Sequence, residues 1–279
     1  MKGEQDWLST ITLDLLPLIK ANRSVAAEAL DPSGRMVTMR PNHLHPPFNN
    51  PRIRRALLRA VNQSDFVVAI AGDDPSMWRV GVGIFAPSSP MASDAGMDIL
   101  TGPPDITAAR AEIVAAGYAG ERVVVVAPSD IEDFRRAAEV GADWLRKLGM
   151  NVDYQLSDSG TLTQRREKKV PVDQGGWSCY FLTIPGMDMI DPAGTNFLRG
   201  NARYMGWPDC PLIETLRDAW LDATDPEQRK QIAREVQRQA FTDVPYVPLG
   251  LYRPLSATRA DLQDIPHGFP IFWGVSRRA

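Results

Sequence analysis

Two glycines followed by aromatic residues form the most promising ligand-binding segment of this 279-residue chain, Gly-Gly-Trp-Ser-Cys-Tyr at positions 175–180. A glycine pair lets the backbone come close to another group. Trp177 and Tyr180 offer flat apolar walls that end in a polar atom. The pattern predicts non-covalent capture of a small molecule, with contacts from Gly176, Trp177, Ser178, Cys179 and Tyr180. A buried core strand with a glycine bulge would show the same pattern, so that interpretation stays open.

Two carboxylates follow this segment at Asp188 and Asp191, and Pro192 comes next. Carboxylates at this spacing could form a general acid/base pair or hold a cationic group. An Asp-Pro pair also starts turns, and this structural role is favoured for Asp191. We therefore count Asp188 among the candidate ligand-binding residues, and an enzyme that uses both acids is the weakest of three hypotheses.

Metal and cofactor chemistry finds little support in the residue types. His43 and His45 flank a Pro-Pro turn, where a solvated loop is favoured over a metal site. Cys179 and Cys210 have no ligand spacing for zinc, and they are compatible with either a disulfide or two buried thiols. Glycine patterns of phosphate and dinucleotide sites are absent. The sequence predicts no metal and no cofactor.

Charge and hydropathy narrow the class further. The chain has 31 basic and 34 acidic residues, a net charge of −3, which argues against a nucleic-acid-binding surface. The basic run at 165–169 is interrupted by Glu167 and reads as a solvated helix end. The apolar run at 11–19 contains Asp14. We therefore expect no signal peptide in this chain and no membrane-spanning stretch.

The elements that would position these residues follow from local patterns. Residues 121–127 form a continuous β-branched run, typical of a strand buried on both faces. Ser129 and Glu132 predict a capping box for an amphipathic helix over 129–148, which Gly149 ends. Alternation at 152–156 predicts a half-buried strand. This strand–helix–strand order indicates an α/β fold with a partly parallel sheet.

Other segments carry similar signals. Asn50 as an N-cap and Pro51 as the first helical residue predict a helix over 51–61, and Asp225 with Pro226 predicts another helix start. The remaining expectations are a short helix at 7–20, a strand at 35–41, mostly loop at 72–105, a helix from 105 to 117 and a strand at 244–252.

The segment 41–62, which contains Pro-Pro-Phe-Asn-Asn-Pro-x-Ile-Arg-x-Ala-Leu, resembles the crossover segment of the family 5 solute-binding proteins, the receptors of peptide- and nickel-type ABC importers. Four further segments match the family in the same order. They are Gly-Glu-x-Asp at 3–6, Gly-Trp at 206–207, the stretch 225–252 and Phe-Trp at 272–273. Members of the family are roughly twice this length, so we expect the chain to be a C-terminal half.

This resemblance implies a type II periplasmic-binding-protein fold. It places the second, ligand-binding lobe at 40–240, part of the first lobe at 1–39 and a return segment at 241–279, with hinge crossings near 38–42 and 241–246. In the family the Gly-Trp strand lines the ligand cleft. Peptide binders carry an Asp shortly after the Trp that pairs with the ligand's ammonium group. Cys179, Tyr180 and Phe181 stand there instead, which puts free-peptide binding in doubt.

The resemblance predicts the substrate-binding component of an ABC importer, with a small solute such as a peptide or peptide-like compound as its ligand. Its partner would be a membrane permease, and its parent protein would be periplasmic or extracytoplasmic. An incomplete first lobe would expose apolar surface, so we expect the isolated chain to self-associate. The alternative is a sensory or regulatory solute-binding module attached to another protein.

Overall fold

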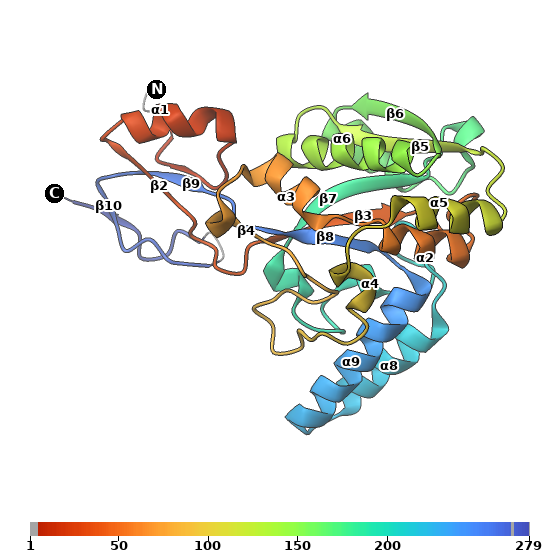
Figure 1. Cartoon of the computed structure of the whole chain (residues 1–279). Helices are drawn as coiled ribbons and strands as arrows, with labels where there is room; N and C mark the ends of the chain where they lie inside the picture. The colour runs from red at the N-terminus through yellow and green to blue at the C-terminus, as the bar shows by residue number, and fades with distance from the viewer. Residues whose placement is uncertain (1–4, 269–270, 279) are drawn as a thin grey trace.

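The computed structural model describes residues 5–268 and 271–278 and has a larger and a smaller lobe (Figure 1). A six-stranded sheet of order β4-β8-β3-β7-β5-β6 forms the centre of the larger lobe. A three-stranded sheet of order β1-β9-β2 and a two-stranded sheet, β10-β11, form the smaller lobe. The smaller lobe thus combines segments from the beginning and the end of the described chain, such as β2 and β10 (Figure 1).

The six-stranded sheet is mixed. β3 (Arg35–Pro41) lies between β7 (Cys179–Pro185) and β8 (Val247–Tyr252) and runs antiparallel to both. β5 (Arg122–Pro128) runs parallel to β7 and to β6 (Asn151–Ser157), and β4 (Trp78–Arg79) pairs with β8 at the other edge. The strands expected at 35–41, 121–127 and 244–252 are thus confirmed.

The predicted strand–helix–strand unit is confirmed as β5, α6 (Glu132–Lys147) and β6, and β5 is buried. The helix lies very close to the sheet at Gly141, where an added Cβ atom would be 2.1 Å from the Phe181 ring. The predicted capping box is wrong. α6 begins at Glu132, whose carboxylate binds arginines, and the Ser129 amide donates to the Ser157 carbonyl instead. Leu156 is exposed, so β6 does not alternate as expected.

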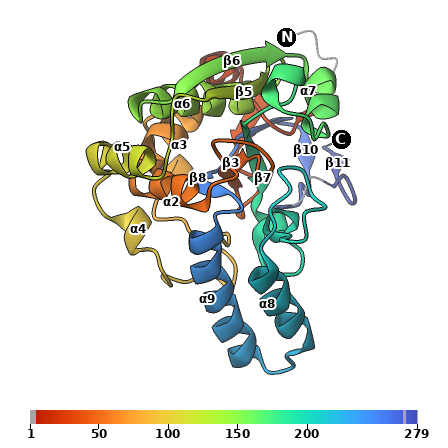
Figure 2. The ribbon, with the colours of Figure 1, turned by 90° about the vertical axis from the view of Figure 1, so that its right-hand side faces the viewer.

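The predicted helix starts are confirmed at α2 (Pro51–Arg59), α5 (Ile106–Ala115) and α9 (Pro226–Asp243). In each case the residue before the helix caps it: Asn50, Asp105 and Asp225 accept backbone amide hydrogen bonds. α3 (Gln63–Ala71) was not predicted. α9 pairs with α8 (Pro211–Asp222), and the two project from the larger lobe as a hairpin (Figures 1 and 2).

The remaining elements are short. Segment 72–105 is mostly loop, as predicted, and contains η2 (Pro75–Met77) and α4 (Asp98–Thr101). Segment 158–198 contains α7 (Ser159–Arg166), η3 (Val172–Gln174), η4 (Gly186–Met189) and η5 (Asn196–Leu198).

The smaller lobe corrects the expected helix at 7–20. Its N-terminal part forms β1 (Trp7–Leu8), η1 (Leu13–Leu15), α1 (Leu16–Ala21) and β2 (Val25–Glu28). The β-branched run Thr10, Ile11 and Thr12 disfavours helix, so helical structure starts only after it. The C-terminal part forms β9 (Ser256–Arg259), β10 (Leu262–Gln263) and β11 (Ser276–Arg277). Gly3 and Glu4 of the first family match lie outside the described residues.

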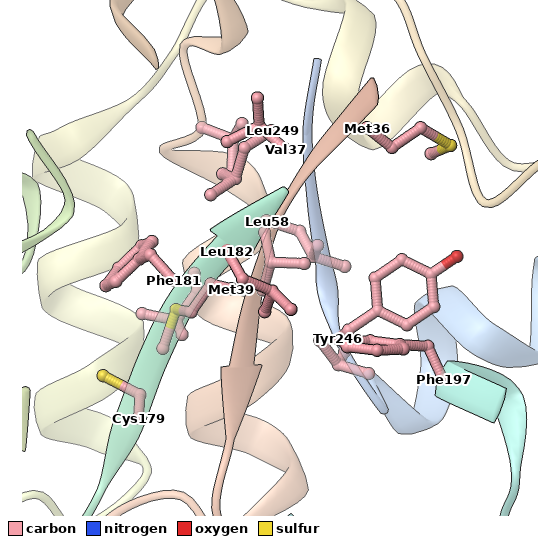
Figure 3. Packing of buried hydrophobic residues seen from close by; sticks show 14 of the residues in the cluster. Met36, Val37, Met39, Leu58, Cys179, Phe181, Leu182, Phe197, Tyr246 and Leu249 are labelled. Carbon is pink, nitrogen blue, oxygen red and sulfur yellow. The ribbon is translucent and has the colours of Figure 1, made fainter. Parts of the chain in front are cut away.

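The hydrophobic cores of the two lobes differ in size. Val37 and Met39 of β3 are fully buried on the same side of the sheet as Phe181 of β7 and Leu249 of β8, whereas Met36 is fully buried on the other side (Figure 3). This cluster extends through the whole larger lobe. Among the described residues of the smaller lobe, the buried cluster comprises Ile11, Ile19 and Ala257. The chain passes between the lobes twice, at 29–34 between β2 and β3 and at 253–255 between β8 and β9.

Candidate functional site

A cavity of about 570 Å³ lies between the two lobes. Its walls from the smaller lobe come from the segment 10–20, Ala27 and Leu255. Its walls from the larger lobe come from the end of α3, the start of α6, Met77 and Tyr252. A concave site shared by two lobes is a favoured place for small-molecule binding.

The parallel strands explain why α6 begins at this cavity. β5 and β7 run in the same direction, so their carboxyl ends meet at one edge of the sheet. The turn after β5 places the segment 130–133 there, next to Thr183 near the end of β7. Crevices outside the carboxyl ends of parallel strands are the usual ligand sites of α/β sheets.

Asp133 is the centre of a hydrogen-bonded network at the cavity. Its Oδ2 accepts from the Tyr252 hydroxyl at 2.6 Å and from Thr183 Oγ1 at 2.8 Å. Arg35 Nε donates to Thr183 Oγ1 at 2.9 Å, and Arg35 Nη2 donates to the Thr183 carbonyl at 3.0 Å. Burial, and then the charge of Asp133, raise the pKa of Tyr252, so this hydroxyl stays protonated and donates.

The other acidic residues at the cavity already have protein partners. Glu132 binds Arg135 and Arg136, each at 2.7 Å, and these hydrogen bonds, that of Arg135 first, lower the pKa of Glu132. Asp130 accepts from the Ser159 amide at 2.9 Å and from its hydroxyl at 2.8 Å. Asp74 accepts from the Ser76 amide and hydroxyl in the same way.

One ion pair joins the two lobes across this region. Arg136 of α6 reaches Asp14 of the smaller lobe at 3.5 Å, although the Asp14 side chain is 81% exposed. An exposed pair of this kind contributes little to stability. It does place a charge of each lobe at the rim of the cavity.

A second cavity, of about 310 Å³, lies beyond the end of β7. Its walls include Thr183, Asp188, Asn196, Phe197 and Tyr204. Asp188 is thus the one predicted site residue that lines either cavity. Asp191 forms the predicted turn, because its Oδ1 accepts from the amides of Ala193 and Gly194 at 2.9 and 2.7 Å.

The aromatic residues of the predicted site are buried in the larger lobe. Trp177 is 0% exposed, and its ring packs against Tyr180 at 5.0 Å and Trp207 at 5.6 Å between centroids. Cys179 pairs with Pro41 while Pro185 pairs with Arg35, so Trp177 lies beyond the end of β7 that is farther from the smaller lobe. The structure brings Trp177 and Tyr180 together but not to either cavity, and their role in ligand binding stays a prediction.

The backbone of this segment is engaged by the protein itself. The Gly176 amide donates to the Pro171 carbonyl at 3.0 Å, and its carbonyl accepts from Arg165 Nη2 at 2.9 Å. The Trp177 carbonyl accepts from Asn42 Nδ2, and Ser178 exchanges hydrogen bonds with Val124. An added Cβ atom at position 176 would be 1.9 Å from a backbone oxygen, so local packing alone requires this glycine.

The remaining candidates have their environment set by the protein itself, and the binding role predicted for Cys179 stays a prediction. Cys179 and Cys210 are free and buried, and burial raises the pKa of the Cys210 thiol to about 12. His45 contacts the Lys169 carbonyl at 2.7 Å. His43 does not lie in a solvated loop as expected: its Nε2 is buried and has no hydrogen-bond partner among the described residues. Burial, then the charges of Arg54 and Arg40, hold the pKa of His43 well below its usual range.

The described residues lack two other kinds of feature. No group of three or more His, Cys, Asp or Glu side chains there is arranged to hold a metal ion. No helix within 5–268 and 271–278 has the length and hydrophobicity needed to cross a membrane.

Sequence reasoning missed Asp133, Thr183 and Tyr252. A single acid in the first turn of a helix is common because the helix dipole favours negative charge there. The sequence position of Asp133 therefore did not indicate a binding site. The usable signal was the strand–helix–strand unit, which places the residues after β5 at a sheet edge where ligands bind. Nothing in the sequence indicated that β7 and β8 would bring two hydroxyls to the same carboxylate.

Comparison with known proteins agrees with this architecture. The model of the bacterial extracellular solute-binding proteins, family 5 Middle, matches residues 1–192. The chain belongs to this family. The relationship suggested by the sequence and the α/β fold are therefore confirmed.

Individual relatives support the assignment. A probable peptide ABC transporter periplasmic-binding protein of Sinorhizobium fredii is 33% identical over 99% of this chain and 52% of its own length. The dipeptide-binding protein of Pseudoalteromonas sp. SM9913, solved with Met-Leu, has a TM-score of 0.80 at 22% identity, over 99% of this chain and 54% of its own. DppA of Helicobacter pylori, solved with the peptide STSA, also has a TM-score of 0.80, at 18% identity over 99% and 53%.

These matches define the scope of the assignment. The chain spans about half the length of the relatives it matches, and the likeness to the solved structures concerns the fold. The matched family and proteins are described as extracellular or periplasmic binding proteins. The family assignment therefore supports a solute-binding role and an extracytoplasmic parent protein, and the ligand is a matter for proposal.

Proposed function

We propose that this chain is the C-terminal portion of the receptor of an ABC importer, and that it captures a small solute such as a peptide or peptide-like compound without a covalent bond. The observation that carries the proposal is the cavity of about 570 Å³ whose walls come from both lobes. This volume falls within the roughly 300–1,000 Å³ typical of small-molecule sites. No catalytic step is required of its residues.

A site shared by two lobes couples binding to a change of shape. A solute that contacts both walls binds the closed arrangement better and shifts the population toward it. Residues 38–42 lie within or directly after β3, and β3 pairs with neighbours on both sides. We therefore place the hinge at the two crossings 29–34 and 253–255 instead of at 38–42 and 241–246. The boundaries between the two lobes then also lie at these crossings.

Delivery of the solute requires a partner in the membrane. The family assignment supports an ABC permease that recognises the closed receptor outside the cytoplasm. The coding sequence upstream of Met1 tests this against a sensory role. A secretion signal followed by the rest of a first lobe supports transport, whereas a DNA-binding domain supports a regulatory module.

The binding site itself can be tested by filling the cavity. The protein encoded by the whole gene is screened by thermal shift against a library of peptides, amino acids and small organic acids, and hits are measured by calorimetry. A solute at a hundred times its Kd adds about 2.7 kcal/mol to the free energy of unfolding. We expect Thr12→Trp and Ala71→Trp, which fill the cavity from opposite lobes, to abolish binding.

The matched control is Ala219→Trp on the exposed face of α8, which adds the same ring far from the cavity. We expect this variant to bind like the wild type. The proposal fails if no solute binds, or if both cavity-filling variants fold and bind normally.

A further inference from the structure

Four consecutive backbone positions at the C-terminal end of α9, 242–245, each bind a basic side chain. The last carbonyls of a helix have no partner within the helix, and the helix dipole favours cations there. Arg54 Nη2 donates to the Asp243 carbonyl at 2.8 Å, and Arg40 Nη1 donates to the Pro245 carbonyl at 2.9 Å. In the order of positions 242–245, the side chains are Arg55, Arg54, His43 and Arg40. These four side chains, from α2, β3 and the turn after β3, form the α9 clasp.

The backbone inside the clasp is strained. Val244 ends α9 with a φ of 49°, in the left-handed region that a β-branched residue rarely adopts. Such a conformation persists only where the surrounding structure holds it. Val244 is fully buried, and Arg54 and Arg40 bind the carbonyls on either side of it. The clasp therefore holds the end of α9 in a conformation that the free backbone disfavours.

His43 is the member of the clasp whose charge can change near neutral pH, because arginines stay charged. Its ring hydrogen-bonds to the Val244 backbone, and its Nε2 is buried with no hydrogen-bond partner among the described residues. Burial, and then the charges of Arg54 and Arg40, hold the pKa of His43 well below its usual range, so the ring is neutral at neutral pH. A proton on the ring would add a buried cation beside two others and an N–H without an acceptor.

The groups around the clasp offer little to offset this added charge. Asp243 is the acid whose charge acts on Arg54, and its carboxylate already accepts from Gln239 Nε2 at 2.9 Å. The other titratable groups beside the two arginines are phenols and thiols, which carry no charge at neutral or acidic pH. They belong to Tyr180, Tyr204, Cys210 and Tyr246. A protonated His43 is therefore repelled by Arg54 and Arg40 in the closed clasp.

The clasp also connects α9 to the second cavity. Arg40 is fully buried, and it donates to the carbonyls of Met205 at 2.7 Å and Phe197 at 2.8 Å as well as to that of Pro245. Its guanidinium lies over the rings of Phe197 and Tyr204, at 5.1 and 5.3 Å from their centroids. Both rings line the second cavity. A change at the clasp can therefore reach the wall of that cavity and the hairpin of α8 and α9 together.

We propose that the α9 clasp is an acid-sensitive switch: when His43 takes up a proton from the solvent, the C-terminal end of α9 separates from α2 and β3 while the strands of the sheet stay folded. The open form is favoured in acid because the charged ring reaches water and moves away from the two arginines. Opening also relieves the backbone strain at Val244. The inference goes beyond the proposed solute-binding function and does not depend on which solute is bound.

Hydrogen–deuterium exchange, followed by mass spectrometry on the protein encoded by the whole gene, tests the switch because it detects local opening. Exchange is measured at about pH 7.5 and about pH 5, on either side of the usual histidine pKa, and corrected for its intrinsic pH dependence. A proton that binds the open form raises its population by up to about tenfold per pH unit below the usual value of 6.5. We expect the protection of residues 238–244 to fall by about tenfold. Residues 123–127 of β5, buried in the same lobe, should keep their protection.

Two variants make the result specific. His43→Gln keeps a polar side chain that cannot take up a proton, so it should remove the loss of protection in acid. His45→Gln is the matched control. His45 lies two residues further along and contacts the Lys169 carbonyl at 2.7 Å, so this variant should lose protection in acid as the wild type does.

Three results would overturn the proposal. The first is unchanged protection of the α9 end in the wild type, and the second is an equal loss in β5, which would indicate global unfolding. The third is the same loss in His43→Gln as in the wild type. If His43→Gln does not fold, exchange of the His43 ring C–H in the wild type reports its proton uptake directly. Proton uptake by His43 without loss of protection at the α9 end would then reject the switch.

Discussion

The larger and the smaller lobe bury their apolar residues to very different extents. In the larger lobe, strands from the middle of the sheet are buried on both faces, and helices α3 and α6 cover one of them. In the described part of the smaller lobe, three residues form the buried cluster, while Leu18, Phe272 and Trp273 are 66%, 67% and 84% exposed. We infer that the larger lobe is stabilised by its own core and that the smaller lobe depends on contacts beyond it.

The largest expected effect concerns the two cores. Phe181 is 1% exposed and stacks on Phe66 at 6.1 Å, so Phe181→Ala should lower the free energy of unfolding by about 3–5 kcal/mol. Ile19→Ala should cost less than about 2 kcal/mol, because water can enter its small cluster as the side chain is removed. Urea unfolding of both variants measures the difference. An equal decrease in the free energy of unfolding in both variants would show that the core of the smaller lobe contributes as much to stability as that of the larger lobe.

A smaller effect is expected from pH. His43 of the larger lobe has its pKa lowered from a usual value of 6.5, so below that pH the unfolded chain binds a proton that the folded chain does not. Stability should therefore fall as the pH drops below about 6.5, by up to about 1.4 kcal/mol per pH unit for this group. Denaturant unfolding at about pH 7.5 and about pH 5, on either side of the usual histidine pKa, measures how the free energy of unfolding changes with pH.

The comparison between lobes supplies the control for this slope. His43→Gln should flatten it, whereas His267→Gln should not, because His267 is 61% exposed in the smaller lobe. A slope that survives in His43→Gln would assign the pH dependence to other groups.

The smallest expected effect concerns association. We expect the isolated chain to self-associate through the exposed apolar residues of the smaller lobe. Trp273→Glu or Leu18→Glu should weaken the association roughly tenfold, as for a residue central to an interface. Sedimentation velocity over a concentration series measures the change.

A matched substitution in the larger lobe completes this experiment. Leu221 on α8 is 56% exposed, similar to Leu18. Leu221→Glu should leave the association unchanged. A monomeric wild-type chain would contradict the expected self-association. An equal effect of Leu221→Glu would contradict the placement of the self-association surface on the smaller lobe.

The sequence predicted the larger lobe better than the smaller one for a physical reason. The run at 122–128 and the capped starts at Asn50 and Asp225 carry their own local signals, and the structure follows them. Segment 7–20 has mixed apolar periodicity and only a marginal core to select among conformations. Its helix was therefore predicted too early in the chain.

The cavity was harder to predict than the fold. Trp177 and Tyr180 attract attention because aromatic residues beside glycines suit a binding site, but the same residues suit a core, and in this structure they are buried. Asp133, Thr183 and Tyr252 are distant in the sequence and meet only because β7, β8 and α6 meet. Local sequence patterns do not show that these three side chains come into contact, because that depends on the order of the strands in the sheet.

The absence of a side chain at Gly141 has a consequence for the cavity at the other end of the same helix. Gly141 lies two turns after Asp133, about 12 Å along the axis at 1.5 Å per residue, and lets α6 rest directly on the Phe181 ring. Packing at Gly141 therefore sets the distance between α6 and the sheet, and this distance determines the position of the N-terminal end of the helix. Any side chain at position 141 would push α6 away from the sheet. The carboxylate of Asp133 would then move away from the hydroxyls of Thr183 and Tyr252, which donate hydrogen bonds to it.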